Sequence, residues 1–247
     1  MRGLFITFEG TEGSGKTTQI AALAERLRSL GRAVRVLREP GGTPIGEEIR
    51  HTLKSSEANR AMTPEAELLL LNASRAQLVR EVIRPALAAG EIVLCDRFYD
   101  SSLAYQAYGR GLDINQVRRV ISFAVGRTRP RLTLLLLVPV AVSEARRRAR
   151  PAERDRMEEA GRAFFERVEK GYQAIAAAAP ARIRCLDATA PVEVVAGEIW
   201  SAVAPCLGKV PQPGTILKGL TSLSPGLRLA APERREGGGT SYPGKSS

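Results

Sequence analysis

The sequence predicts an α/β fold in which a parallel sheet is covered by helices on both faces. Short apolar runs rich in β-favouring residues alternate with longer segments whose apolar residues recur at helical spacing. One run, residues 131–138, is so uniformly apolar that it fits an interior strand of a parallel sheet. At 247 residues, the chain is also long enough for one such domain to bury a sizeable core.

The first elements are defined by apolar spacing and by glycine and proline. Residues 4–8 form an apolar run and predict the first strand. The apolar residues that follow recur every three or four positions and predict a helix that ends near Gly31. Residues 33–37 then predict a second strand. Residues 38–44 contain two prolines and a glycine pair, which indicate a loop.

Two helices and a strand are expected next. We predict one helix over residues 45–54. A second runs from Thr63, as N-cap, to about residue 89, because Pro64 suits the first helical position. Residues 91–95 are short and apolar and predict the third strand.

The second half continues the alternation. Helical patterns occupy residues 101–108 and 115–125, before the apolar strand 131–138. A helix from about residue 143 leads into an arginine-dense segment, and another covers residues 157–178. Residues 182–186 predict the last strand and residues 192–203 the last helix. We expect residues 1–204 to form one domain and residues 205–247, rich in Gly, Pro and Ser, to be a disordered basic tail.

Residues 10–17 match the phosphate-binding pattern G-x-x-x-x-G-K-[ST] between a predicted strand and helix. Glycines at such positions let backbone N–H groups surround a polyphosphate, and the helix directs its positive end toward that charge. Lys16 is expected to reach the β- and γ-phosphates, and the Thr17 hydroxyl to hold Mg²⁺. The predicted ATP-binding residues are Gly10, Thr11, Glu12, Gly13, Ser14, Gly15, Lys16, Thr17 and Thr18.

The amino-acid composition indicates which kinds of ligand the protein binds. The net charge of +11 predicts anionic ligands, but aromatic residues make up only 5% and none lies within the main arginine cluster. A phosphate-rich small molecule therefore explains the charge better than nucleic acid. The apolar runs are too short to span a membrane. Three widely spaced cysteines without a C-x-x-C pattern argue against a disulfide framework and predict a cytoplasmic protein.

Further residues suggest a second anion site. Asp96 and Arg97 follow an apolar strand, where Asp approaches the Mg²⁺ shell and Arg grips phosphate with two N–H groups. Leu71 and Arg75 share one helix face. Another helix face carries Ser102, Tyr105 and Gln106. The N-K-x-D and D-x-x-G patterns of regulatory GTPases do not occur downstream of the P-loop, which argues against a GTP switch.

Residues 146–156 contain six arginines in eleven positions, interrupted by Pro151. Proline is unfavourable inside a helix, so we expect a loop between two helices. In a phosphoryl-transfer enzyme such a loop closes over ATP and brings arginines to the transferring group.

The sequence resembles the bacterial thymidylate kinases, a family of nucleoside monophosphate kinases. Four blocks show the resemblance: residues 8–18, residues 38–43, residues 96–98 with 101–106, and residues 155–158. The blocks follow the order of the family, the resemblance covers about residues 3–204, and the tail after Pro205 is not covered. The resemblance implies a P-loop kinase fold with an arginine-rich lid, ATP-dependent phosphorylation of dTMP with Mg²⁺, and a homodimer.

The resemblance also implies roles for single residues. Arg75 and Arg97 would hold the dTMP 5′-phosphate near Arg50 and Glu39, Tyr105 would pack on the deoxyribose, and Ser102 and Gln106 would face the thymine. Thr17 and Asp96 would serve the metal. The implied catalytic set is Lys16, Arg97 and the lid residues Arg150, Arg154 and Arg156.

Two positions depart from the family pattern. Leu71 stands where the family usually has a phenylalanine that stacks on thymine, which predicts weaker dTMP binding or looser base selection. The strand at 131–138 lacks the two acidic residues that the family often has there.

Two other functions remain open at this point. A deoxynucleoside kinase has the same P-loop scaffold but phosphorylates a neutral hydroxyl, and this chemistry favours a carboxylate base and less positive charge. A basic nucleic-acid-binding ATPase would instead use the arginine cluster and the tail to contact phosphates.

Overall fold

The computed structural model describes residues 3–149 and 160–208. Within these residues, five parallel strands form one sheet in the order β2-β3-β1-β4-β5. The strands are β1 (Leu4–Glu9), β2 (Val34–Arg38), β3 (Ile92–Asp96), β4 (Leu132–Leu137) and β5 (Ile183–Asp187). The predicted α/β fold with a parallel sheet is therefore confirmed.

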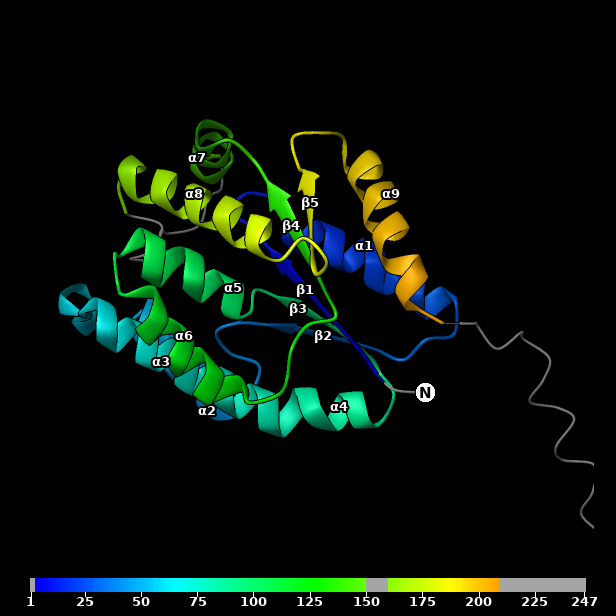
Figure 1. Cartoon of the computed structure of the whole chain (residues 1–247), viewed down its shortest axis with the longest axis horizontal. Helices are drawn as coiled ribbons and strands as arrows, with labels where there is room; N and C mark the ends of the chain where they lie inside the picture. Colours follow the sequence, from blue (N-terminus) through cyan, green and yellow to red (C-terminus); the bar gives the residue numbers. More distant parts are fainter. Residues whose placement is uncertain (1–2, 150–159, 209–247) are drawn as a thin grey trace, which may run out of the picture. The chain divides into compact units, whose positions relative to one another are not determined.

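Helices cover both faces of this sheet (Figure 1). The longer ones are α1 (Lys16–Ser29), α2 (Pro44–Lys54), α3 (Pro64–Leu78), α6 (Ile114–Val125), α7 (Val140–Arg148), α8 (Arg162–Ala178) and α9 (Val192–Val203). Shorter helical pieces are η1 (Glu57–Ala61), η2 (Val79–Ile83), α4 (Arg84–Ala88), α5 (Tyr99–Ser102), η3 (Leu103–Gly109) and η4 (Ala204–Cys206). None of the helices in the described ranges combines the length and apolarity that a bilayer crossing requires.

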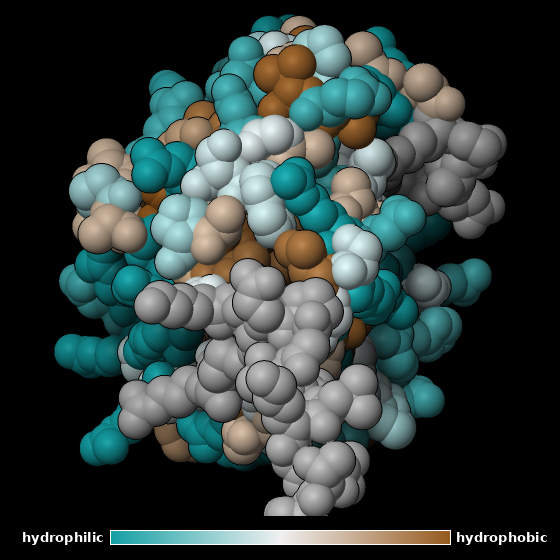
Figure 2. Space-filling view, turned by 90° about the vertical axis from the view of Figure 1, so that its right-hand side faces the viewer, coloured by the Kyte–Doolittle hydropathy of each residue, from teal (hydrophilic) through white to brown (hydrophobic). Residues whose placement is uncertain are grey.

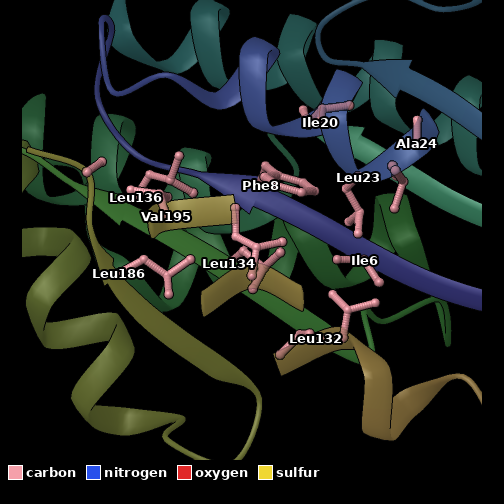
Figure 3. Close-up of a cluster of buried hydrophobic side chains, with 14 of the residues drawn as sticks. Ile6, Phe8, Ile20, Leu23, Ala24, Leu132, Leu134, Leu136, Leu186 and Val195 are labelled. Carbon is pink, nitrogen blue, oxygen red and sulfur yellow. The ribbon is translucent and has the colours of Figure 1, made fainter. Parts of the chain in front are cut away.

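The core follows the alternation of side chains along the strands. Ile6 and Phe8 of β1 pack with α1 and α9 on one face, while Phe5 packs with α3 and α6 on the other. Figure 3 shows the first cluster, in which Phe8 and Leu134 lie among side chains of the covering helices. Because both faces are buried, the sheet is held rigidly, and the loops after its strands start from fixed points.

Two predicted helices are interrupted. The segment predicted as one helix over residues 64–89 is divided into α3, the π-helical segment η2 and α4. Pro85 has no N–H and crowds the preceding turn, which accounts for a change of helical hydrogen bonding just before it. A second π-helical segment, η3, takes up most of the predicted helix 101–108.

Several helix and domain boundaries in the structure differ by a few residues from those predicted from the sequence. Helix α7 begins at Val140 rather than near residue 143, directly after Pro139, a residue suited to a helix start. The predicted domain end at residue 204 falls at the start of η4, and Leu207 still packs against the core. The compact unit extends to Gly208. Residues 209–247, predicted as a disordered tail, lie outside the described residues.

Candidate active site

The carboxyl ends of three neighbouring strands define the site. In the register of the sheet, Phe8 lies beside Asp96, and Asp96 lies beside Arg38. The loops that follow β1, β2 and β3 therefore leave the sheet at one level, next to one another. The P-loop, Glu39 and Arg97 lie at this edge.

The P-loop depends on glycine at defined points. Gly10 has a φ of 135°, and a Cβ there would overlap the backbone oxygen of Leu136. Gly15 has a φ of 86° and caps α1 in the left-handed conformation. Both conformations are unfavourable for residues with side chains. These glycines allow the loop to lie close to β4 and to turn into the helix.

Lys16 is buried at the centre of this loop. Its Nζ donates to the backbone oxygens of Gly10 at 3.1 Å and Thr11 at 2.9 Å, and contacts Ser14 Oγ at 3.4 Å. Burial and the neighbouring Arg97 lower the pKa of Lys16 to about 8, although nearby carboxylates oppose the shift. The ammonium is thus positioned by its own loop.

A cavity of about 260 Å³ opens beside the P-loop. Its lining contains several cationic side chains and few apolar ones, which suits polyphosphate. The lining residues are Glu12, Gly13, Gly15, Lys16, Thr17, Thr18, Arg38, Glu39, Arg50, Lys54, Asp96 and Arg97. We call it the P-loop cavity.

Two oxygen ligands suited to a divalent cation lie in this cavity. Thr17 Oγ1 is 3.3 Å from Asp96 Oδ2. The other carboxylate oxygen, Asp96 Oδ1, is buried and accepts no hydrogen bond from the part of the chain that the structure describes. Such hard oxygens suit Mg²⁺, which usually keeps one or two protein ligands and completes its shell with phosphate and water. The residues present therefore fit the metal that the sequence predicts.

Arg97 lies between the P-loop and a second pocket. It adopts a φ of 68°, which is unusual for a residue with a side chain. Its guanidinium donates to Glu12 Oε1 at 2.6 Å and to the backbone oxygen of Gly10 at 2.9 Å. Burial raises the pKa of Glu12, but Arg97 and Lys16 outweigh this effect and hold that pKa below its usual value. An anion is therefore stable beside Arg97.

The second pocket, which we call the acceptor pocket, is more apolar than the P-loop cavity. It is lined by Glu12, Glu39, Pro40, Lys54, Leu71, Arg75, Arg97, Ser101, Ser102, Tyr105 and Gln106. Tyr105 donates its hydroxyl to Glu12 Oε2 at 2.7 Å. Glu12, Glu39, Lys54 and Arg97 line both cavities. These shared residues make the two cavities neighbours.

Arg75 lies in the acceptor pocket but not among the residues that line the P-loop cavity. The side chain is 2% exposed. Its guanidinium donates to Glu39, Asn72, Ser102 and the backbone oxygen of Phe98. The resemblance implies that Arg75 holds the 5′-phosphate, and these contacts fix the position of its guanidinium in the acceptor pocket.

The structure thus brings together most of the predicted site residues. Arg50, which donates to the backbone oxygen of Pro40, lies in the P-loop cavity, and Leu71, Ser102 and Gln106 lie in the acceptor pocket. The predicted lid residues Arg150, Arg154 and Arg156 lie outside the described residues. Arg146, at the start of that cluster, donates to the backbone oxygens of Gly13 and Ala188, each at 3.1 Å.

Sequence reasoning missed several residues of this region, among them Lys54 and Glu9. Lys54 lines both cavities, and its spacing of four from Arg50 on a helix was a signal that the two share a face. Glu9 is buried behind the P-loop, where it accepts hydrogen bonds from the backbone N–H of Phe98 and from Tyr172. Burial and the carboxylate of Asp100 raise the pKa of Glu9 to about 7. No local pattern marks Glu9, because its partners are distant in sequence.

Comparison with known proteins agrees with this geometry. Residues 8–199 match the family model described as thymidylate kinase. The thymidylate kinase of Thermomicrobium roseum is 54% identical over 199 residues, which cover 81% of this chain and 93% of the relative. The thymidylate kinase of Deinococcus radiodurans is 50% identical over 203 residues, which cover 82% and 97%.

A solved structure is similar as well. The crystal structure of thymidylate kinase from Ehrlichia chaffeensis superposes with a TM-score of 0.66 at 31% identity. The match covers 82% of this chain and 99% of that one. Together with the P-loop cavity and the adjoining acceptor pocket, these matches show that the chain belongs to the thymidylate kinase family.

Proposed function

We propose that this protein phosphorylates dTMP to dTDP by binding ATP with Mg²⁺ in the P-loop cavity and dTMP in the acceptor pocket. The observation that supports this assignment is the wall that the two cavities share. Arg97 is part of that wall, so a phosphate in either cavity lies close to its guanidinium. Two phosphorylated ligands are therefore brought end to end, as direct phosphoryl transfer requires.

The reaction needs little covalent chemistry from the protein. An oxygen of the dTMP phosphate forms a bond to the γ-phosphorus, and the bond from that phosphorus to the bridging oxygen breaks, which releases ADP. The attacking oxygen is already anionic, so no strong general base is needed. Two unit charges 4 Å apart repel by about 4 kcal/mol at an effective dielectric constant of 20. Lys16 and Arg97 offset this repulsion and stabilise the transition state.

Thr17 and Asp96 would hold the metal, because both present oxygens at the edge of the P-loop cavity. Mg²⁺, when bound, neutralises charge on the β- and γ-phosphates. A metal site formed by Thr17 and Asp96 beside the P-loop also supports ATP, which binds as a magnesium complex, as the phosphate donor.

The acceptor assignment divides the pocket into two ends. Arg97 binds the 5′-phosphate, since it is the arginine that reaches both cavities and carries an anionic partner, Glu12. Leu71, Ser102 and Gln106 face the thymine, and Tyr105 packs on the deoxyribose. Arg75, which also lines the acceptor pocket and pairs with Glu39, holds the 5′-phosphate together with Arg97.

The lid assignment rests on the sequence. Arg150, Arg154 and Arg156 would close over ATP and reach the transferring phosphoryl group. Arg146 supports this placement, because its guanidinium already contacts the backbone of Gly13 in the P-loop. The cluster therefore begins beside the phosphate-binding loop.

We further propose a homodimer that forms through α3 and α6. Phe123 of α6 is 85% exposed and Leu69 of α3 is 58% exposed, and these two helices lie side by side. Large apolar side chains at such exposure are typical of protein interfaces. We also place the enzyme in the cytoplasm, because its three cysteines are free thiols.

The two alternative functions are not favoured. A deoxynucleoside kinase acting on a neutral nucleoside would gain little from a cationic wall between the cavities. A nucleic-acid-binding ATPase does not explain an acceptor pocket lined by Leu71, Ser102 and Gln106. The family to which the chain belongs argues against both.

Substitution of Arg97 tests the assignment. In Arg97→Ala, kcat/KM for dTMP should fall by about 10²–10³, the effect of losing one charge-stabilising donor. Lys16→Ala should abolish turnover at every concentration of ATP and of dTMP. The matched control is Arg35→Ala, because Arg35 forms an exposed pair with Glu91. A steady-state assay of ADP release measures all three variants. An unchanged kcat/KM for dTMP in Arg97→Ala would show that the acceptor site lies elsewhere.

A further inference from the structure

Glu67 is a buried carboxylate close to the acceptor pocket that does not line either cavity. It lies in the first turn of α3, and its side chain is 0% exposed. Oε1 accepts a hydrogen bond from Gln106 Nε2 at 2.8 Å. The Arg110 guanidinium donates to both oxygens, at 3.3 and 3.1 Å. The cation compensates the buried negative charge, which would be costly alone.

This contact determines which end of the Gln106 amide is available. A carboxylate only accepts hydrogen bonds, so it holds the NH₂ end of a neighbouring amide and repels the oxygen end. The remaining atom, Gln106 Oε1, is buried and finds no hydrogen-bond partner in the ranges 3–149 and 160–208. Gln106 lines the acceptor pocket with Leu71 and Ser102, so the amide end that Glu67 leaves unpaired is the end that can meet a ligand there.

We propose that Glu67 is a positioning residue for base selection, which acts by fixing the orientation of the Gln106 amide. This inference rests on the proposed dTMP site. With Oε1 presented, the pocket favours a base that carries a ring N–H donor, such as thymine or uracil. A base that carries an unprotonated ring nitrogen at that position, as cytosine does, would leave two acceptors facing each other. An unsatisfied buried polar pair of this kind costs roughly tenfold or more in affinity.

The substitution Glu67→Gln removes the constraint. Its own amide can accept from Gln106 or donate to it, so the Gln106 amide is free to turn. The ratio of kcat/KM for dTMP to that for dCMP should fall at least tenfold, mainly through a lower KM for dCMP, because the turned amide presents an N–H to the unprotonated ring nitrogen. The ratio of dTMP to dUMP should stay within twofold, because both bases carry the ring N–H. A purely structural role would not move these two ratios differently.

Two controls isolate the effect. Glu81→Gln makes the same change at an exposed carboxylate that accepts from Gln77 at 2.7 Å, so it should leave both ratios unchanged. The reciprocal swap Glu67→Gln/Gln106→Glu returns a carboxylate to the pair, and one of its oxygens again faces the pocket. The swap should restore the preference for dTMP over dCMP.

The outcomes separate this inference from the proposed function. A wild-type protein that does not convert dTMP refutes the function itself. A folded Glu67→Gln protein that keeps the dTMP to dCMP ratio within twofold refutes only the role of Glu67. If Glu67→Gln does not fold, the swap is measured instead, and a folded swap without the preference refutes that role. Failure of both variants to fold assigns Glu67 to stability alone and also overturns the proposal.

Discussion

At the scale of single residues, Lys16 shows how the protein prepares a site for polyphosphate. Its ammonium is held by two backbone oxygens and its side chain is largely buried, so the charge is in place before a ligand binds. The same burial lowers the pKa to about 8. Lys16 therefore loses its positive charge at a pH at which an exposed lysine would still be protonated.

This shift predicts a pH dependence for ATP. A lysine loses its charge as the pH rises through its pKa, so kcat/KM for ATP should fall about tenfold per pH unit above about 8. ATP favours the charged form, so calorimetry at pH 8.5 in two buffers should also show proton uptake on ATP binding. A profile that stays flat to pH 10 would contradict the shift.

Leu71 gives the second prediction at this scale. It lines the acceptor pocket with apolar contact but without an aromatic face. In Leu71→Phe, ring stacking should add about 0.5–1.5 kcal/mol and lower the KM for dTMP roughly two- to tenfold. Leu71→Met, which keeps the volume and adds no ring, should leave KM within about twofold. Equal KM values in the wild type and Leu71→Phe would show that the base does not lie on this residue.

At the scale of elements, the close approach of α8 and η3 positions part of the site. A Cβ added to Gly171 of α8 would lie 2.8 Å from the Tyr108 ring of η3. This approach brings Tyr172 within reach of buried polar partners, because its hydroxyl donates to Glu9 and contacts Ser101. Helix packing on one face of the sheet therefore supports the residues behind the P-loop.

Substitution of helical glycines tests this packing. Gly171→Ala should destabilise the protein by about 1–3 kcal/mol, because overpacking exceeds the gain in helix propensity. Gly197→Ala in α9, where the new Cβ meets nothing within 4 Å, should instead stabilise it by roughly 0.5–1 kcal/mol. Denaturant unfolding measures both free energies. Equal effects of the two substitutions would contradict a tight contact between α8 and η3.

At the scale of the whole molecule, the order of the strands creates the active site. Strands β2, β3 and β1 are neighbours, so their loops meet although they are separated by up to about ninety residues. The face in Figure 2, apart from the residues drawn in grey, carries mostly hydrophilic side chains and a few separate hydrophobic ones. The larger exposed apolar side chains of α3 and α6 are the ones that suggest an interface.

The proposed homodimer leads to a prediction at this scale. The wild type should have the mass of a dimer in light scattering, and Phe123→Glu should shift it toward the monomer, because a buried unpaired charge opposes association. Val194→Glu is the control, since this residue is also exposed but lies on α9. Its mass should equal that of the wild type. A monomeric wild type would refute the dimer.

The sequence was sufficient to predict the positions of the strands and the phosphate-binding motif. The predicted strands agree with β1 to β5 within one or two residues, because their apolar runs are short and bounded by charged or turn-forming residues. The π-helical segments were not predictable, because helical spacing does not distinguish an α-helix from a π-helix over a single turn. The roles of the predicted site residues stay predictions until the variants are measured.

The sequence by itself determined the P-loop with its strand and helix, and the position of Asp96 and Arg97 at the end of a strand. Those patterns depend only on residues that are neighbours in sequence. Only the tertiary structure decided that the Arg75 guanidinium donates to Glu39, and that Gln106 donates to Glu67. Hydrogen bonds of this kind join residues about forty positions apart. Their geometry depends on how helices pack on the sheet, and no local pattern encodes it.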